Sequence, residues 1–325
     1  MSTTTTRGGP PATGVPPARG AVGDPRSLQR QSPRLGETAV MLVLRSAAIL
    51  SVLVTVGIVA SLLVPALSFF REVSIREFLT GTRWTPRFSG QESYGVLPLV
   101  TGTLWTTVIA LLIAVPFGLG AAVLLAEYAR ERVRKVLKPV LEVLAGIPSV
   151  VYGFFALAFV APFVLNDLLG LEVGTFSVLS AGLVLGIMII PTVASLSEDA
   201  MSAVPMSLRQ GSYALGANKM RTTLRVVFPA AVSGIAASIV LGLSRAIGET
   251  MIVALAAGTQ ARMVTGPTEQ GQTMTGFIAQ TATGESTPGT LSYNTLFAVG
   301  LLLFALTFVI NIISIRLVRR FREAY

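Results

Sequence analysis

The sequence predicts an all-α polytopic membrane protein with six transmembrane helices, from its composition, its long apolar runs and the distribution of its basic residues. Of the 325 residues, 52% are hydrophobic and 13% are charged, whereas about 25% are charged in a typical soluble domain. The chain has no cysteine and no histidine, so thiolate nucleophiles, imidazole bases and the usual zinc and haem ligand sets are missing. We therefore expect no catalytic site and no metal site.

The six apolar runs set the order of the elements. Residues 1–38 are rich in Thr, Gly, Pro and Arg without apolar periodicity, which predicts a disordered tail. The predicted spans follow, and each exceeds the ~20 residues that cross a bilayer as a helix. They are residues 41–69, 99–126, 140–165, 176–197, 230–257 and 294–318.

The basic residues predict the orientation. Cytoplasmic segments of membrane proteins carry an excess of Lys and Arg. With a cytoplasmic N-terminus, the inside segments hold 18 such residues and the outside segments hold 5. The sequence therefore predicts that both termini are cytoplasmic, which requires an even number of spans. The same cytoplasmic surface predicts local ion pairs of Glu127 and Glu142 with the basic loop between them, including Lys138 with Glu142.

The longest predicted inside loop, residues 198–229, carries a spaced motif. Gln210, Gly211 and Ser212 are followed after three residues by Gly216, and after nine more by a segment that ends at Pro229. Its basic, helix-favouring composition is compatible with an amphipathic helix on the membrane surface. The spacing also resembles the EAA loop of permease subunits in ATP-binding-cassette importers, with Gln-Gly-Ser in place of Glu-Ala-Ala. That resemblance implies a coupling helix that docks on the ATPase.

A charged pair interrupts the fifth apolar run. Arg245 lies near its centre, where an arginine costs at least ~2.5 kcal/mol on insertion scales. Glu249 follows four residues later, on the same face of a continuous helix. One interpretation is a structural ion pair that neutralises itself. The other is a water-filled path in which the guanidinium binds an oxyanion.

The segment from Arg245 to Met251, together with residues 94–106, 116–128 and 144–153, resembles the permeases of phosphate-specific ATP-binding-cassette importers. The resemblance covers residues 94–320 and favours the C subunit (PstC) over the sister A-type subunit. It implies a type I importer permease with a MetI-like core in 94–320, preceded by an extra span and its periplasmic connection (39–93) and followed by a cytoplasmic C-terminus (321–325). It also implies that Arg245, Glu249 and Thr250 line the path of inorganic phosphate across the bacterial cytoplasmic membrane.

The same resemblance implies the partners. These are a sister permease, a dimer of cytoplasmic ATPases and an extracytoplasmic phosphate-binding protein, and no nucleic acid. The sequence contains no P-loop, and none of its lysines follows a glycine, so we expect ATP and Mg²⁺ to bind the partner ATPase and no cofactor to bind this chain. The alternatives are a permease for another oxyanion, an ATP-independent transporter or channel, and a membrane scaffold or sensor.

Overall fold

The structure is a computed structural model that describes residues 35–320 apart from 88–89, 285–286 and 288. Most of the predicted N-terminal tail and the C-terminal residues 321–325 lie outside the described residues. The chain divides into two compact units, residues 1–55 and 56–325. The boundary falls within α1 (Leu35–Glu72), a single helix that begins three residues before the predicted end of the tail.

Five helical segments of the described chain are long and apolar enough to cross a membrane. A sixth is a pair of helical stretches, Lys219–Ala230 and Val232–Gly248, that meet at a bend of 70°. The prediction of an all-α protein with six spans is confirmed if this bent pair is one span. The five segments are α1, α3 (Leu97–Val123) with its π-helical end η2 (Leu124–Tyr128), α5 (Ser149–Phe155) continuing as η3 (Ala156–Leu168), α6 (Val178–Ser202) and α13 (Leu291–Arg320).

Two predicted spans differ from the structure. The third begins at Ser149 instead of residue 140, because residues 140–145 belong to a separate helix, α4 (Glu131–Ala145). This helix is amphipathic and ends at Gly146, and Pro148 directly precedes α5. The fifth predicted span is broken: α10 (Val232–Gly248) ends before Glu249, and a short helix, α11 (Met251–Ala256), follows.

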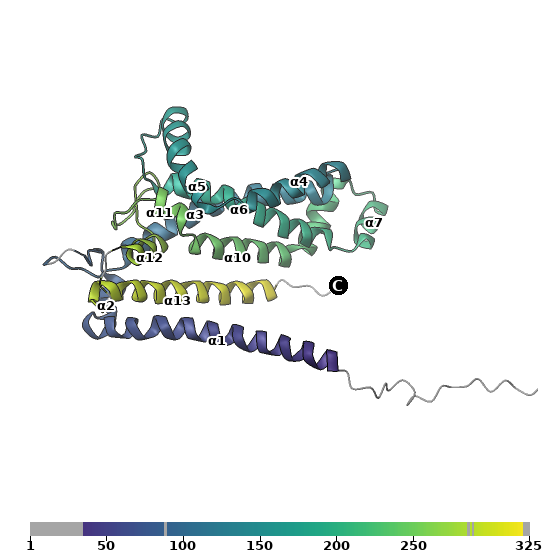
Figure 1. Cartoon of the computed structure of the whole chain (residues 1–325). Helices are drawn as coiled ribbons and strands as arrows, with labels where there is room; N and C mark the ends of the chain where they lie inside the picture. Colours follow the sequence, from purple (N-terminus) through teal and green to yellow (C-terminus); the bar gives the residue numbers. More distant parts are fainter. Residues whose placement is uncertain (1–34, 88–89, 285–286, 288, 321–325) are drawn as a thin grey trace, which may run out of the picture. The chain divides into compact units, whose positions relative to one another are not determined.

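Helices α3 and α6 pack closely along their length. A Cβ atom added at Gly182 would lie 2.7 Å from the Cβ of Ile109, and one at Gly118 would lie 2.8 Å from the Cβ of Val193. Glycine therefore permits the two helix axes to approach, as small residues do in membrane bundles. In unit 2, α10 contacts both α6 and α13, and Figure 1 shows α10 running beside α13.

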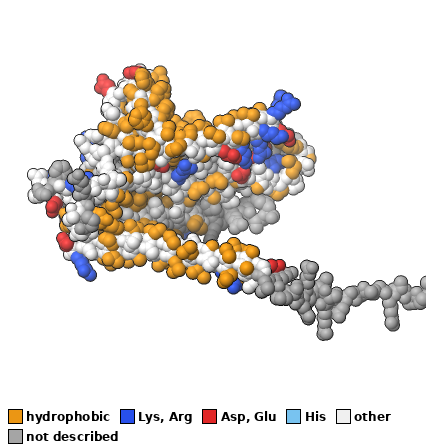
Figure 2. Space-filling view, viewed as in Figure 1, with side chains coloured by type: hydrophobic (Ala, Val, Ile, Leu, Met, Phe, Trp, Pro, Cys, Tyr) orange, Lys and Arg blue, Asp and Glu red, His pale blue; other side chains and the backbone are white. Residues whose placement is uncertain are grey.

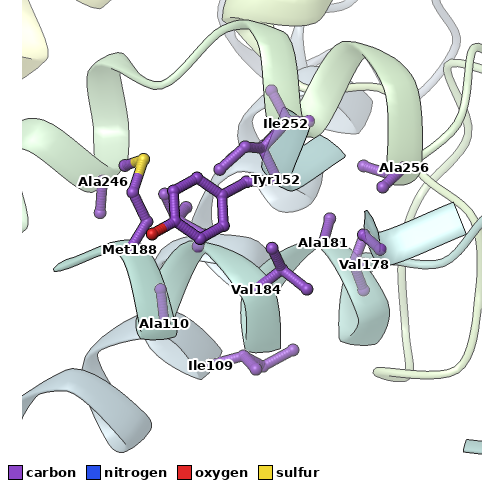
Figure 3. Close-up of a cluster of buried hydrophobic side chains, with 14 of the residues drawn as sticks. Ile109, Ala110, Tyr152, Val178, Ala181, Val184, Met188, Ala246, Ile252 and Ala256 are labelled. Carbon is purple, nitrogen blue, oxygen red and sulfur yellow. The ribbon is translucent and has the colours of Figure 1, made fainter. Parts of the chain in front are cut away.

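The principal core cluster joins α3 and α6 to the helices around them. Figure 3 shows the ring of Tyr152 from α5 among small aliphatic side chains. The labelled partners are Ile109 and Ala110 of α3, Val178, Ala181, Val184 and Met188 of α6, Ala246 of α10, and Ile252 and Ala256 of α11. This cluster fixes α10 and α11, and therefore the break between them, against α6.

Short helices complete the described chain: α2 (Ile75–Thr80), α7 (Met206–Ala214), α8 (Lys219–Thr222), η4 (Thr223–Val227), α9 (Phe228–Ala230) and α12 (Met274–Thr283). A second core cluster of aromatic and aliphatic side chains joins α2 and α12 to the neighbouring segments. Figure 2 shows Lys and Arg side chains gathered over α4, while hydrophobic side chains cover much of the rest of this face of unit 2.

Candidate functional site

Arg245 lies in the last turn of α10, three residues before the helix ends. Its side chain is half-buried, and Nη1 donates a hydrogen bond of 3.0 Å to Oγ1 of Thr192 on α6. No other hydrogen bond of this guanidinium is formed within the described part of the chain. Arginine has five N–H donors, so most of them remain available for an anion.

Glu249 lies outside the helix that carries Arg245. Its backbone is extended (φ −66°, ψ 133°), and its Oε1 accepts hydrogen bonds from the backbone N–H groups of Met251 (3.1 Å) and Ile252 (3.4 Å). The carboxylate therefore satisfies the first N–H groups of α11, where negative charge is favourable. Among the residues that the structure describes, no ion pair joins Glu249 to Arg245. The prediction that the two share a continuous helix face is wrong, because α10 ends at Gly248 and Glu249 lies in the break before α11.

The break between α10 and α11 is held from a third element. Oγ1 of Thr275, on α12, donates a hydrogen bond of 2.6 Å to the carbonyl of Glu249. Thr250 is half-buried in the break, and its Oγ1 donates to the carbonyl of Gly248 at 3.3 Å. Non-helical backbone within a membrane protein is tolerated where protein buries it or where it lines a cavity. The three predicted pathway residues thus lie at a helix break that is stabilised by α12.

The predicted coupling loop contains two short helices joined by a tight turn. Gln210 and Gly211 are exposed on α7, and Oγ of Ser212 lies 2.9 Å from Oγ1 of Thr222 on α8. Gly216 forms the turn with a φ of +80°, which favours glycine because a Cβ atom strains this conformation. Pro229 lies in the first turn of α9, where a missing N–H costs nothing. The spaced motif is therefore a helix, a glycine turn and a second helix.

Residues 114–323 match a family described as "Binding-protein-dependent transport system inner membrane component". The chain belongs to this family. It is 38% identical over 282 residues to a probable ABC transporter permease of Bacillus subtilis, with 86% of this chain and 90% of the relative covered. It is 34% identical over 290 residues to the phosphate transport system permease protein PstC of Mesorhizobium japonicum, with 83% and 86% covered.

Solved importer structures share the fold of this permease. A methionine ABC transporter chain in an inward-facing conformation matches with a TM-score of 0.51 at 21% identity, and the match covers 70% of this chain and 95% of that one. A chain of a bacterial ABC transporter that imports alginate matches with a TM-score of 0.58 at 16% identity, and covers 88% and 100%. The predicted importer-permease architecture is confirmed, and the chain is a multi-span membrane permease.

Ion pairs of this permease join residues far apart in sequence. The carboxylate of Glu127, at the end of η2, pairs with Arg209 of α7 at 3.0 Å. Glu198 of α6 is fully buried and pairs with both Arg134 and Lys138 of α4. The local pairing predicted for Glu127 and for Lys138 is wrong. Glu127 pairs with Arg209 of α7, and Lys138 pairs with carboxylates of α6. No spacing pattern in the sequence singles out Glu198 or Arg209.

The Lys138 ammonium also contacts Asp199, at 3.0 Å. The hydrogen bond with Glu198, followed by the one with Asp199, raises the pKa of Lys138 above its ordinary value. The cation is therefore retained at any physiological pH. The Glu198 cluster fastens the amphipathic helix α4 to the end of α6.

A pocket of about 500 Å³ lies between the loop at residues 84–87, the loop at residues 259–261 and α12. Its described lining contains Arg87 and three glutamines but no carboxylate. The Arg87 guanidinium donates to Oγ1 of Thr281 at 3.1 Å. The indole of Trp84 is buried against Phe78 and Phe277, so this side chain is part of the core. The pocket is a hollow of mixed lining that carries one positive charge, and it is formed by segments that the sequence predicts to be extracytoplasmic.

Proposed function

We propose that this chain is the C-type permease subunit of an ATP-driven importer that moves inorganic phosphate across the bacterial cytoplasmic membrane, with both termini in the cytoplasm. The observation that carries the proposal is the position of Arg245 at a helix break with most of its donors free. The named phosphate-permease relatives support the choice of substrate.

The site has the chemistry for passage of an oxyanion. A guanidinium donates paired hydrogen bonds to phosphate oxygens, and Thr192 orients the group from α6. The Glu249 carboxylate lies in the break that follows α10. Its negative charge repels an anion and therefore opposes tight binding. The hydroxyl of Thr250 adds a neutral donor beside the break. Together these groups favour brief binding over retention, as a transport pathway requires.

The energy source and the remaining subunits belong to the proposal as well. A sister permease completes the pathway, and a dimer of ATPases that bind ATP and Mg²⁺ docks on the predicted coupling loop (Gln210, Gly211, Ser212, Gly216 and Pro229). A phosphate-binding protein delivers substrate at the extracytoplasmic surface, on which the Arg87 pocket opens. This chain performs no chemistry on the substrate and holds no cofactor. ATP-driven closure of the ATPase dimer switches the permease between outward-open and inward-open states.

The test is uptake of radiolabelled phosphate at micromolar concentration by cells that lack their own high-affinity phosphate permeases. The cells receive the chain with its partner subunits, as wild type, Arg245→Gln, Thr192→Val or Arg132→Gln. Arg132 is an exposed arginine of α4 and controls for loss of a positive charge. We expect Arg245→Gln to abolish uptake, Thr192→Val to weaken it, and Arg132→Gln to leave it unchanged, with equal amounts of assembled complex in all four.

Three outcomes would contradict the proposal. Uptake by this chain without the ATPase would indicate an independent transporter. Full ATPase binding without phosphate uptake would indicate another oxyanion as substrate. Loss of the assembled complex in Arg245→Gln would indicate that the arginine has a structural role.

A further inference from the structure

Arg209 is a buried arginine in α7, a helix whose other residues are exposed or half-buried. It lies on α7, one residue before the exposed Gln210, and its side chain is only 9% exposed. Its partner Glu127 is 5% exposed. A buried charge is costly unless it is paired and fully hydrogen-bonded. The charge is paired with Glu127, and the guanidinium donates four hydrogen bonds in all, so this pair is part of the built structure of the permease.

The guanidinium joins three elements at once. Nε and Nη2 donate to Oε1 of Glu127 at 3.3 and 3.0 Å, which ties α7 to the end of η2. Nη1 donates to the carbonyl of Val204 at 2.5 Å, and Nη2 also donates to the carbonyl of Met201 at 2.7 Å. Met201 lies in the last turn of α6 and Val204 lies two residues beyond it, where carbonyls near a helix C-terminus favour a nearby cation.

A second contact supports the first. The residue after Glu127 is Tyr128, and the ammonium of Lys219 lies 5.0 Å from the centre of its ring, within the range of a cation–π interaction. Lys219 begins α8. We call residues 206–222, which contain α7, the Gly216 turn and α8, the coupling segment. Glu127 therefore holds α7, and the next residue, Tyr128, holds α8.

These contacts determine where a movement of the coupling segment is transmitted. The covalent connection to α10 passes through η4, α9 and a bend of 70°. The route through Arg209 leads directly to α3 and α6, whose close packing at Gly118 and Gly182 leaves no room for sliding without repacking. Close packing of this kind resists relative sliding and transmits strain from one helix to the other.

We propose that Arg209, held by Glu127, is a positioning residue that makes the coupling segment move as one body with α3 and α6 during ATP-driven transport. The inference rests on the proposed function, because it takes residues 206–222 as the contact with the ATPase. It adds a specific mechanical link. Movement of the ATPase enters the membrane through α3 and α6, and reaches Arg245 through Thr192 of α6.

The first experiment measures this link without using substrate. The chain has no cysteine, so spin labels can be placed at Leu124→Cys on η2 and Ser207→Cys on α7, both of them exposed. The distance between the labels is measured in the assembled, otherwise cysteine-free complex, with and without bound ATP. With Arg209 in place, we expect the same distance in both states. In Arg209→Ala, we expect a distance that changes on ATP binding.

The second experiment measures coupling in proteoliposomes that contain the complete complex. We expect Arg209→Ala to assemble and hydrolyse ATP but to transport about tenfold less phosphate per ATP, within the range of typical couplings between sites. Arg209→Lys keeps the positive charge but has fewer hydrogen-bond donors. We expect its ratio of phosphate to ATP to lie between those of the wild type and Arg209→Ala. Arg132→Ala is the control, since this exposed arginine contacts none of the three linked elements through a side-chain hydrogen bond in the described chain.

The outcomes separate the two proposals. The inference would be overturned if Arg209→Ala transports as much phosphate per ATP as the wild type. The same holds if this variant assembles less complex but the assembled complex shows the wild-type ratio. If Arg209→Ala does not assemble, Arg209→Lys and Glu127→Gln are measured, and an unchanged label distance in both would overturn it. If the wild type moves no phosphate, the proposed function fails, while the label distances still decide whether α7 and η2 move together.

Discussion

Gly216 offers the sharpest test of the coupling segment, because its substitution isolates backbone strain. Its φ is +80°, and no atom lies within 4 Å of a Cβ added there. The turn ends α7 with two hydrogen bonds, from Gly216 N–H to the carbonyl of Tyr213 (2.9 Å) and from Ala217 N–H to the carbonyl of Ser212 (3.1 Å). This is the Schellman pattern, in which glycine adopts the left-handed conformation.

The cost of substitution follows from that geometry. An L-residue in the left-handed region loses about 1–2 kcal/mol, and no steric term adds to it because the surrounding space is open. Gly216→Ala should therefore shift the local equilibrium toward an opened turn by about 5–30-fold. Gly216→Asn should cost less, since asparagine tolerates this region, and Gly216→Val should cost more because its side chain is β-branched.

The assay is hydrogen exchange of the amides in residues 215–222, together with the amount of ATPase that co-purifies with the permease. Amide exchange should become faster from Gly216→Asn to Gly216→Ala to Gly216→Val. The amount of ATPase that co-purifies with the permease should decrease in the same order. Gly211→Ala is the matched control for exchange. This glycine is helical, also has no atom within 4 Å of an added Cβ, and should slow exchange by stabilising α7 by about 1 kcal/mol. Wild-type exchange and ATPase retention in Gly216→Val would refute the reasoning.

Three further predictions concern packing and charge. Gly186→Ala places a Cβ 2.8 Å from a backbone carbonyl of α3 and should destabilise the permease by about 1–3 kcal/mol, measured as a lower Tm. The control is Gly120→Ala, whose Cβ meets no atom within 4 Å and should leave the Tm unchanged. Glu198→Gln removes the buried carboxylate that pairs with the partly exposed cations Arg134 and Lys138 and should lower the free energy of unfolding by about 1–2 kcal/mol. In the wild type, the pKa of Lys138 is raised, so the stabilisation from this pair is fully present below the ordinary lysine pKa. It is lost as the pH rises through the pKa of Lys138 in the folded protein. Burial, followed by the Glu92 carboxylate, raises the pKa of Tyr94 to about 12. Phenolate absorbance should therefore include a group that ionises near pH 12, and stability should fall as pH rises from the ordinary tyrosine pKa toward 12.

The sequence predicts the spans where one hydrophobic run corresponds to one helix. The first, second, fourth and sixth spans are found within a few residues of their predicted limits, because a long run without polar interruption has no stable alternative to a helix in lipid. The third fails at its start because the apolar face of the amphipathic α4 continues into the run that follows. Only Gly146 and Pro148 mark the boundary, and prolines also occur inside helices here, for example Pro116 in α3.

The site was predicted less completely than the fold. Local patterns singled out Arg245 as an intramembrane charge and Gly216 as part of a spaced motif, whereas the turn at Gly216 is seen only in the structure. The pairing of Glu127 with Arg209 joins residues 82 positions apart, and only the folded chain brings them together. The rule for charges four residues apart favoured Glu142 as the partner of Lys138, whereas the packing of α4 on α6 supplies the buried Glu198.

The structure also changes how the charged motif of the fifth span is interpreted. On one continuous helix, Arg245 and Glu249 would neutralise each other, and the pair would add little to anion binding. The chain instead uses Glu249 to begin α11 and Thr192 of α6 to hold Arg245. Each charge thus has its own partner, and the arginine keeps its remaining donors. The partners belong to α6 and α11, which the principal core cluster packs against each other. The two charges are therefore held apart by the fold, and the free donors of Arg245 are a property of the folded chain that no spacing rule predicts.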